Sequence, residues 1–274
     1  RQMCIRDRNR WISIAHDYEN PEGEITIAIV GKYTSLQDSY KSLSEAITHG
    51  GIANKLRVKV EWIDSELFET DNDDILTHYL ADVSGLLVPG GFGKRGSEGK
   101  INAIRFARQR HIPFLGICFG MQMAVIEYAR NMLMLDDANS TEVNPNTKNP
   151  VIDLMEEQKN ITEKGGTMRL GAWKCDITRE TLCHSVYKTE NIEERHRHRY
   201  ELNNKYLNQL EENGLVASGK NKDTNLVEVV EVKDHPWFIG VQYHPEYKST
   251  VLSPHPLFVS FVGAAILNLS LIHI

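Results

Sequence analysis

Residues 114–122 read FLGICFGMQ, and this stretch decides the fold. An apolar run ends in Cys118, which stands between Gly116 and Gly120, and a helix-like segment over 119–130 follows directly. The spacing Gly-x-Cys-x-Gly is typical of a sharp strand-to-helix turn that pushes a nucleophile out of the backbone. A cysteine after an apolar run is otherwise a core residue, but a core residue needs no glycine on either side. The stretch therefore predicts a β-strand, a strained elbow that carries Cys118, and a helix.

Strand and helix patterns alternate on both sides of this elbow. Strands are expected over 25–30, 56–63, 85–91, 112–118, 225–232 and 237–243, and helices over 38–51, 72–82, 98–110, 119–130 and 256–267. The alternation predicts an α/β fold, a doubly wound and mostly parallel sheet with helices on both faces. The last two strands predict a small antiparallel extension. Residues 136–166 are polar and are expected to form a long excursion.

The composition is that of an ordinary globular chain: 274 residues, 41% apolar, with a net charge of -6. One domain is expected over 25–267, with residues 1–24 as a linker that carries a foreign tail and 268–274 as a second such tail. No apolar stretch reaches the length of a membrane span, and nothing resembles a secretion signal. The dispersed acidity argues against nucleic-acid binding. The four cysteines form no disulfide framework, which favours a reducing cytoplasm.

Cys118 needs a basic partner to be a nucleophile. The field of the following helix supplies roughly 0.3–1 kcal/mol, whereas lowering a thiol pKa from about 8.5 to about 7 takes roughly 2 kcal/mol. The segment GVQYHPE provides His244 just past a strand, with Glu246 two residues on. An imidazole can accept the thiol proton while a carboxylate orients the ring. A histidine at a strand end is often structural, but beside a cysteine elbow and an acid the catalytic interpretation is favoured.

The segment LLVPGGFGKRGSEGK, residues 86–100, ends a buried strand in a glycine-rich loop. A phosphate-binding P-loop would need glycine six places before its lysine, but Lys94 stands there ahead of Lys100, and Ile101 follows in place of Ser or Thr. An oxyanion hole fits better. The amides of Gly91 and Phe119 are expected to converge on a carbonyl oxygen held over Cys118.

The basic run RHRHRYE, residues 195–201, places its histidines on one side of a strand. Neither cysteine nor a carboxylate cluster accompanies them at ligand spacing, so no metal site is expected. Such a run is commonly solvated surface. The preferred functional interpretation is that one of its arginines pairs with a substrate carboxylate.

Together these segments resemble the class I glutamine amidotransferase family, over roughly residues 11–267. The PGG, GIC-x-G and HPE elements belong to the whole family. Three further segments, ANSTE, GGTMRLGA and RHRHRYE, resemble the branch whose glutaminase domain supplies ammonia for the amination of UTP to CTP.

The resemblance implies a role for particular residues. Cys118 would be the nucleophile, with His244 and Glu246 completing a triad. The residues implied to bind glutamine are Gly91, Phe119, Gly120, Met121, Gln122, Glu142 and Arg199. Among these, Glu142 would receive the ammonium of glutamine, and the excursion would fold back over the site. Phe119 stands where many relatives carry a smaller aliphatic residue, and because only its amide is needed, activity is expected to persist.

The resemblance also implies partners. L-glutamine would be the substrate, and ammonia would pass to an N-terminal synthetase domain that carries ATP, UTP and magnesium and is absent from this chain. No cofactor or metal is expected in the chain itself. The glycine loop 92–99 resembles a lid that responds to GTP, an activator. The full-length protein is expected to be a homotetramer that contacts neither membrane nor nucleic acid.

Other functions stay open on the sequence. Another amidotransferase, of the GMP synthase or carbamoyl-phosphate type, shares the elbow, and so does a γ-glutamyl hydrolase or a related cysteine peptidase. From a different class, a catalytically silent regulatory module or a filament-forming interaction domain remains an alternative. An intact set of Cys118, His244 and Glu246 argues against it.

Overall fold

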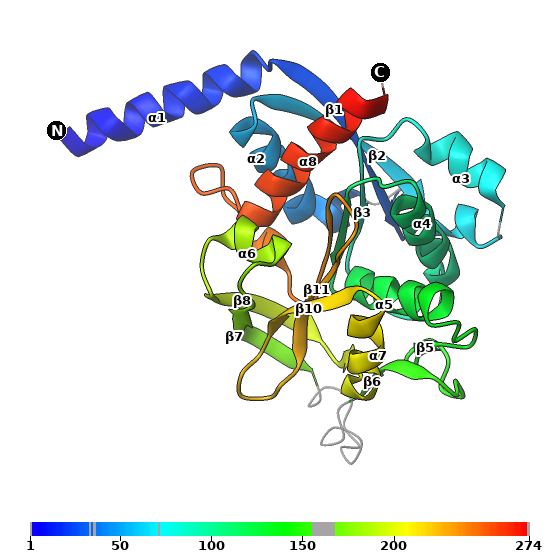
Figure 1. Ribbon diagram of the computed structural model, residues 1–274. Coiled ribbons are helices and arrows are strands. Elements are labelled where there is room, and N and C mark those ends of the chain that lie inside the picture. The colour runs from blue at the N-terminus through cyan, green and yellow to red at the C-terminus, as the bar shows by residue number, and fades with distance from the viewer. Residues whose placement is uncertain (1, 33, 35–36, 71, 155–167, 273–274) are drawn as a thin grey trace.

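The computed structural model describes residues 2–32, 34, 37–70, 72–154 and 168–272 (Figure 1). Within these residues, one sheet of nine strands has the order β2-β1-β3-β4-β12-β11-β10-β7-β8. Its first five strands run parallel to one another and have the bounds β2 (Leu56–Asp64), β1 (Gly23–Gly31), β3 (Gly85–Val88), β4 (Phe114–Ile117) and β12 (Phe238–Val241). Because the strands are parallel, their carboxyl ends meet at one edge of the sheet, where ligands bind in folds of this kind.

Helices cover both faces of the parallel strands, as the alternating pattern predicts. One face is packed under α2 (Lys41–Ala53) and α8 (Pro256–Ile272), and the other under α3 (Asp73–Leu80), α4 (Ser97–Gln109) and α5 (Phe119–Met132) (Figure 1). Side chains of a strand point alternately to the two faces. In β1, Ile27 and Ile29 therefore join the core under α2 and α8, whereas Ala28 and Val30 join the opposite core.

The antiparallel part is larger than the small extension that the sequence predicts. Antiparallel strands continue the same sheet, with the bounds β11 (Val227–Val232), β10 (Leu215–Lys220), β7 (Arg169–Ile177) and β8 (Asn191–His198). The pairing of β11 with β12 confirms the antiparallel pair expected over 225–243. A separate small sheet contains β5 (Asn139–Ser140), β6 (Pro150–Leu154) and β9 (Tyr200–Leu202). Two short helices pack beside the antiparallel strands of the large sheet: α6 (Leu182–Tyr187) contacts β10 and β11, and α7 (Leu207–Glu212) contacts β10.

The two ends differ from the sequence-based expectation. The segment expected as an irregular linker over 1–24 forms α1 (Gln2–Glu19), which projects from the body of the molecule (Figure 1), and β1 begins at Gly23. The closing helix α8 continues past 267 to Ile272. None of the helices that the structure describes is both long and apolar enough to cross a membrane.

Candidate active site

Cys118 lies at a strained turn between β4 and α5. Its backbone has φ 52° and ψ −104°, a conformation that costs a residue with a side chain of order 1–3 kcal/mol. The flanking glycines permit it. A Cβ on Gly120 would lie 2.0 Å from the carbonyl oxygen of Val88 in β3, and a Cβ on Gly116 would lie 2.9 Å from the backbone of Gly120. The predicted elbow is thus present, and both glycines serve close backbone packing.

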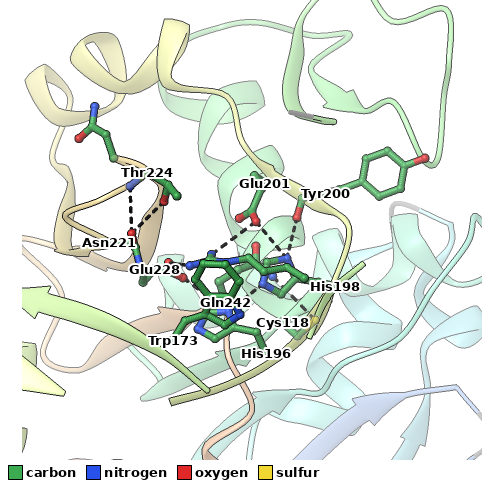
Figure 2. A network of polar contacts seen from close by, with 12 residues as sticks. Cys118, Trp173, His196, His198, Tyr200, Glu201, Asn221, Thr224, Glu228 and Gln242 are labelled. Atoms are coloured by element: carbon green, nitrogen blue, oxygen red, sulfur yellow. Dashed lines mark hydrogen bonds and ion pairs between the residues drawn. The ribbon is translucent and has the colours of Figure 1, made fainter. Parts of the chain in front are cut away.

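Cys118 is 2% exposed, and its sulfur lies beside polar groups. Its Sγ lies 3.9 Å from the carbonyl oxygen of Arg197, and the amide Nε2 of Gln242 donates to Sγ over 3.8 Å (Figure 2). Polar contacts of this kind are not those of a cysteine sealed in hydrocarbon. Cys118 also lines two cavities, of about 250 and about 240 Å³, that share Gly91 and Phe92. Cys118 therefore borders space that a small ligand could occupy.

His244 and Glu246 follow β12 at the same edge of the sheet. The Nδ1 atom of His244 lies 2.8 Å from Oε1 of Glu246, and the imidazole stacks on Tyr247 at 5.3 Å between ring centroids. Its other nitrogen, Nε2, is buried and makes no regular hydrogen bond to another described residue. Gly90 leaves room for the side chains of both His244 and Cys118, since a Cβ there would meet Cε1 of His244 at 3.0 Å and Cβ of Cys118 at 3.6 Å.

The neighbours of His244 determine its charge. Burial by itself lowers the pKa of His244, but the interactions with Cys118 and Glu246 outweigh burial and raise it to about 11. The imidazole is therefore protonated at neutral pH and presents a positive charge beside Cys118. A proton on this ring is available for a leaving group.

The cavity of about 250 Å³ brings together residues that are far apart in the chain. It is lined by Gly91, Phe92, Cys118, Gln122, Glu142, Met168, His198, Arg199 and Tyr200. Its lining includes Cys118, the acidic residue Glu142 and the basic residue Arg199. Burial raises the pKa of the Glu142 carboxyl, while the Gly93 amide, Lys32 and Arg199 act in the opposite direction. A small amino acid, with one ammonium and one carboxylate, matches this charge arrangement.

The small sheet carries Glu142 and Arg199 to the cavity. Glu142 follows β5 in the excursion, and Arg199 lies between β8 and β9, while β6 pairs with β9. The excursion, which is described up to residue 154, thus returns to the site as expected; its remainder, residues 155–166, lies outside the described residues. The first three residues of the segment GGTMRLGA lie outside them as well.

The glycine loop after β3 is held against the site. The ammonium of Lys32 donates to the carbonyl oxygens of Phe92 and Gly93 over 2.7 and 2.9 Å. The amide of Gly93 donates to Oε1 of Glu142 over 2.8 Å. The loop thereby covers the cavity from the side of Gly91, beside the amino end of α5.

Comparisons with known proteins agree with this geometry. The family model described as "Glutamine amidotransferase class-I" matches residues 35–264. The chain belongs to the class I glutamine amidotransferase family. It is 57% identical over 257 residues to CTP synthase from Christiangramia forsetii, covering 94% of the chain and 46% of that relative. It is 58% identical over 260 residues to CTP synthase from Flavobacterium psychrophilum, covering 95% of the chain and 48% of the relative.

This amidotransferase chain therefore spans about half the length of the curated relatives it matches. Among solved structures, the glutaminase domain of Trypanosoma brucei CTPS with bound acivicin has a TM-score of 0.83 and 38% identity. The match covers 89% of the chain and 94% of that domain. Within the family, the chain corresponds to the glutaminase domain of CTP synthases.

Not every residue predicted to contact the substrate lines the amidotransferase cavity. The predicted contacts Gly91, Gln122, Glu142 and Arg199 do line it. Among the described residues, the side chains of Phe119 and Met121 pack in the core, and Gly120 packs on the backbone of β3. Contact with a ligand from these three residues would have to come from their backbone groups. This agrees with the expectation that only the amide of Phe119 is needed.

Sequence reasoning missed the polar network behind the thiol. Gln242 donates to Cys118 and accepts from Nε2 of Gln122 over 3.2 Å. In β8, the histidines of the basic run are buried, and Nδ1 of His196 lies 2.8 Å from Nε2 of His198 (Figure 2). The sequence did hold one indication of Gln242. It stands two residues before His244, and residues two apart in an extended segment point to the same side. The histidines were expected on one side of a strand, but nothing local indicated that this side faces the thiol.

Proposed function

We propose that the chain hydrolyses L-glutamine through a thioester on Cys118. The observation that carries this proposal is the shared cavity, where Cys118, Glu142 and Arg199 line one space of about 250 Å³. In the proposed complex, Glu142 binds the α-ammonium of glutamine and Arg199 binds its α-carboxylate. The side-chain carboxamide then reaches the sulfur. Charge-assisted hydrogen bonds of this type fix orientation as well as affinity.

The proposed reaction is acyl transfer in two steps. The Cys118 thiolate attacks the carboxamide carbon, and the amides of Gly91 and Phe119 stabilise the negative charge that develops on its oxygen. Protonated His244, held by Glu246 at 2.8 Å, donates its Nε2 proton to the departing ammonia, and the thioester remains. Water, deprotonated by the now neutral imidazole, attacks the thioester. Glutamate leaves, and the sulfur returns to its starting state.

The proposed destination of ammonia is UTP, activated by ATP on a synthetase domain with magnesium. The identity of 57–58% to CTP synthases supports this assignment. We further propose that GTP activates the domain through the loop 92–99, whose first residues are joined to Lys32 and Glu142. A homotetramer formed through the synthetase domain and a cytoplasmic location complete the proposal. The free thiols of Cys118, Cys175 and Cys183 suit that compartment.

The test is to trap the nucleophile. Incubation with a chloroketone analogue of glutamine is expected to add one label, and peptide mass spectrometry is expected to find it on Cys118. The matched control is Cys118→Ser, which should release no ammonia and take no label. Label on another residue, or ammonia release by Cys118→Ser at the wild-type rate, would contradict the proposal. Hydrolysis of γ-glutamyl peptides without hydrolysis of free glutamine would favour a γ-glutamyl hydrolase instead.

A further inference from the structure

A lysine lies buried behind the proposed oxyanion hole. Lys100, in the first turn of α4, is 0% exposed, and its Nζ has no hydrogen-bond partner among the described residues. The side chain does not line the glutamine cavity. An ammonium in this situation is costly, because burial removes its water and no acceptor replaces it. Residues that break packing rules in this way cluster at functional sites.

The ammonium of Lys100 lies close to both residues of the proposed oxyanion hole. A Cβ on Gly91 would lie 3.4 Å from Nζ, so the amine stands directly behind the Gly91 backbone. The same Nζ lies over the ring of Phe119, 5.0 Å from its centroid. The electron-rich ring face is therefore the nearest partner that the structure gives this charge. Gly91 and Phe119 are the residues whose amides are proposed to receive the carbonyl oxygen of glutamine.

We propose that Lys100 is a positioning residue of this site. Its buried ammonium holds in place the backbone of Gly91 and Phe119, which together form the wall of the proposed oxyanion hole. The same charge favours negative charge at Cys118 and on the reacting oxygen. The inference rests on the proposed glutaminase function. Lys100 acts through the wall and touches no substrate. In a buried environment, a charge behind the wall acts more strongly than it would in water.

The electrostatic surroundings of Lys100 agree with this role. Burial and the neighbouring charge of Lys32 lower the pKa of Lys100 to about 7, while Cys118 and Asp64 act in the opposite direction. Lys32 and Cys118 directly follow β1 and β4, and Asp64 is the last residue of β2. All three therefore lie at the edge where the parallel strands end. The amine therefore changes charge near neutral pH, and its positive form is favoured when Cys118 is a thiolate.

Lys32 lies near Lys100 but differs from it in the hydrogen bonds of its ammonium group. Lys32 also lies over the ring of Phe119, at 5.5 Å, but its ammonium is already engaged by the carbonyl oxygens of Phe92 and Gly93. The ammonium of Lys100 has no such carbonyl acceptors among the described residues. Its charge is available to the wall and to the thiolate.

The experiment measures alkylation of Cys118 by iodoacetamide from pH 5 to pH 9, with the labelled peptide quantified by mass spectrometry. This readout needs no glutamine. In Lys100→Met, which keeps the length of the side chain without its charge, the midpoint of alkylation is expected to rise by about one pH unit. The kcat for glutamine hydrolysis is expected to fall about tenfold at pH 7, with KM unchanged. Lys100→Arg should restore the midpoint, and Lys205→Met, a change at an exposed lysine, should leave both readouts unaltered.

Stability separates this role from a structural one. Since Lys100 is a buried charge without a partner, Lys100→Met is expected to unfold at the same temperature as wild type or about 2–4 °C higher. Lys100→Gln serves as a second neutral variant. An unchanged alkylation midpoint in the neutral variants, an equal shift in Lys100→Arg, or unfolding of both neutral variants would overturn the inference. Wild-type chain that alkylates normally but does not hydrolyse glutamine would contradict the proposed function alone.

Discussion

The carboxylate of Glu142 accepts a 2.8 Å hydrogen bond from the backbone amide of Gly93. This bond joins the excursion to the glycine loop, two segments that are 49 positions apart in the chain. It also occupies only one oxygen of the carboxylate, because Oε1 is the acceptor. The second oxygen remains for the ammonium of a substrate, so loop and substrate can share Glu142.

Glu142→Gln is expected to raise the KM for glutamine about 10–100-fold, because a hydrogen bond to a charged group contributes about 1.5–3 kcal/mol. The amide keeps an acceptor for Gly93, so the loop stays in place and kcat should change less than threefold. Steady-state release of ammonia measures both constants. Glu45→Gln removes an equal charge from an exposed position of α2 and should have no effect. An unchanged KM in Glu142→Gln would exclude the carboxylate from substrate binding.

Glu246→Gln is expected to lower kcat by on the order of 10²–10⁴-fold, since the carboxylate orients the imidazole of His244 at 2.8 Å. Glu246 helps to raise the pKa of His244, so its removal lowers that pKa. The protonated imidazole is the proposed acid, and the alkaline limit of the rate should therefore move to lower pH. A pH profile of kcat measures both effects. A kcat within threefold of wild type would mean that Glu246 does not orient the ring.

Gly120→Ala is expected to destabilise the fold, because the new Cβ would lie 2.0 Å from the carbonyl oxygen of Val88. Overpacking of this kind costs about 1–3 kcal/mol, which corresponds to a fall in Tm of about 2–12 °C for a domain of this size. Gly91→Ala is the matched control, since its Cβ would meet nothing nearer than Nζ of Lys100 at 3.4 Å. Thermal unfolding followed by circular dichroism compares the two. Equal Tm values would show that the elbow does not need the close approach to β3.

His198→Asn tests the buried histidine pair. Burial and the charge of Arg169 lower the pKa of His198 to about 3, against 6.5 for the exposed side chain, although the carbonyl of Tyr200 acts in the opposite direction. Between these values the unfolded chain binds the extra proton, so wild type loses stability as the pH falls from about 6.5 toward 3. The variant lacks this loss. The stability difference between the two proteins should therefore shrink between pH 7 and pH 4.5.

Urea unfolding at the two pH values measures that difference. His78→Asn, at an exposed position of α3, should show no change in the gap to wild type. A gap between wild type and His198→Asn that stays constant with pH would mean that the histidine is not held neutral by burial.

The parallel strands and the elbow could be predicted because their signals are local. Continuous apolar runs fix β1, β3 and β4, and the glycines on either side of Cys118 fix the turn. The segment HPE likewise predicted His244 and Glu246 as a base and its acid, because the two residues are close together in the chain and can be recognised without any distant segment.

The antiparallel pairing of β7 with β8 was not predicted, although the histidines of 195–201 were expected on a strand. The buried residues of β7 are Arg169, Cys175 and Ile177, which do not form a continuous apolar alternation. Those of β8 are Glu194, His196 and His198, which carry no apolar signal.

The sequence by itself determined the parallel strands, the helices that cover them, the candidate nucleophile Cys118 and its candidate base His244, because each depends on neighbours within a few residues. Only the tertiary structure decided which distant groups surround the thiol. Glu142 was assigned from resemblance alone, and Gln242 and Lys100 had no assigned role, because their positions depend on how β5, β12 and α4 pack at one edge of the sheet. Burial, and with it the pKa of Lys100, is a property of that packing. No local pattern encodes it.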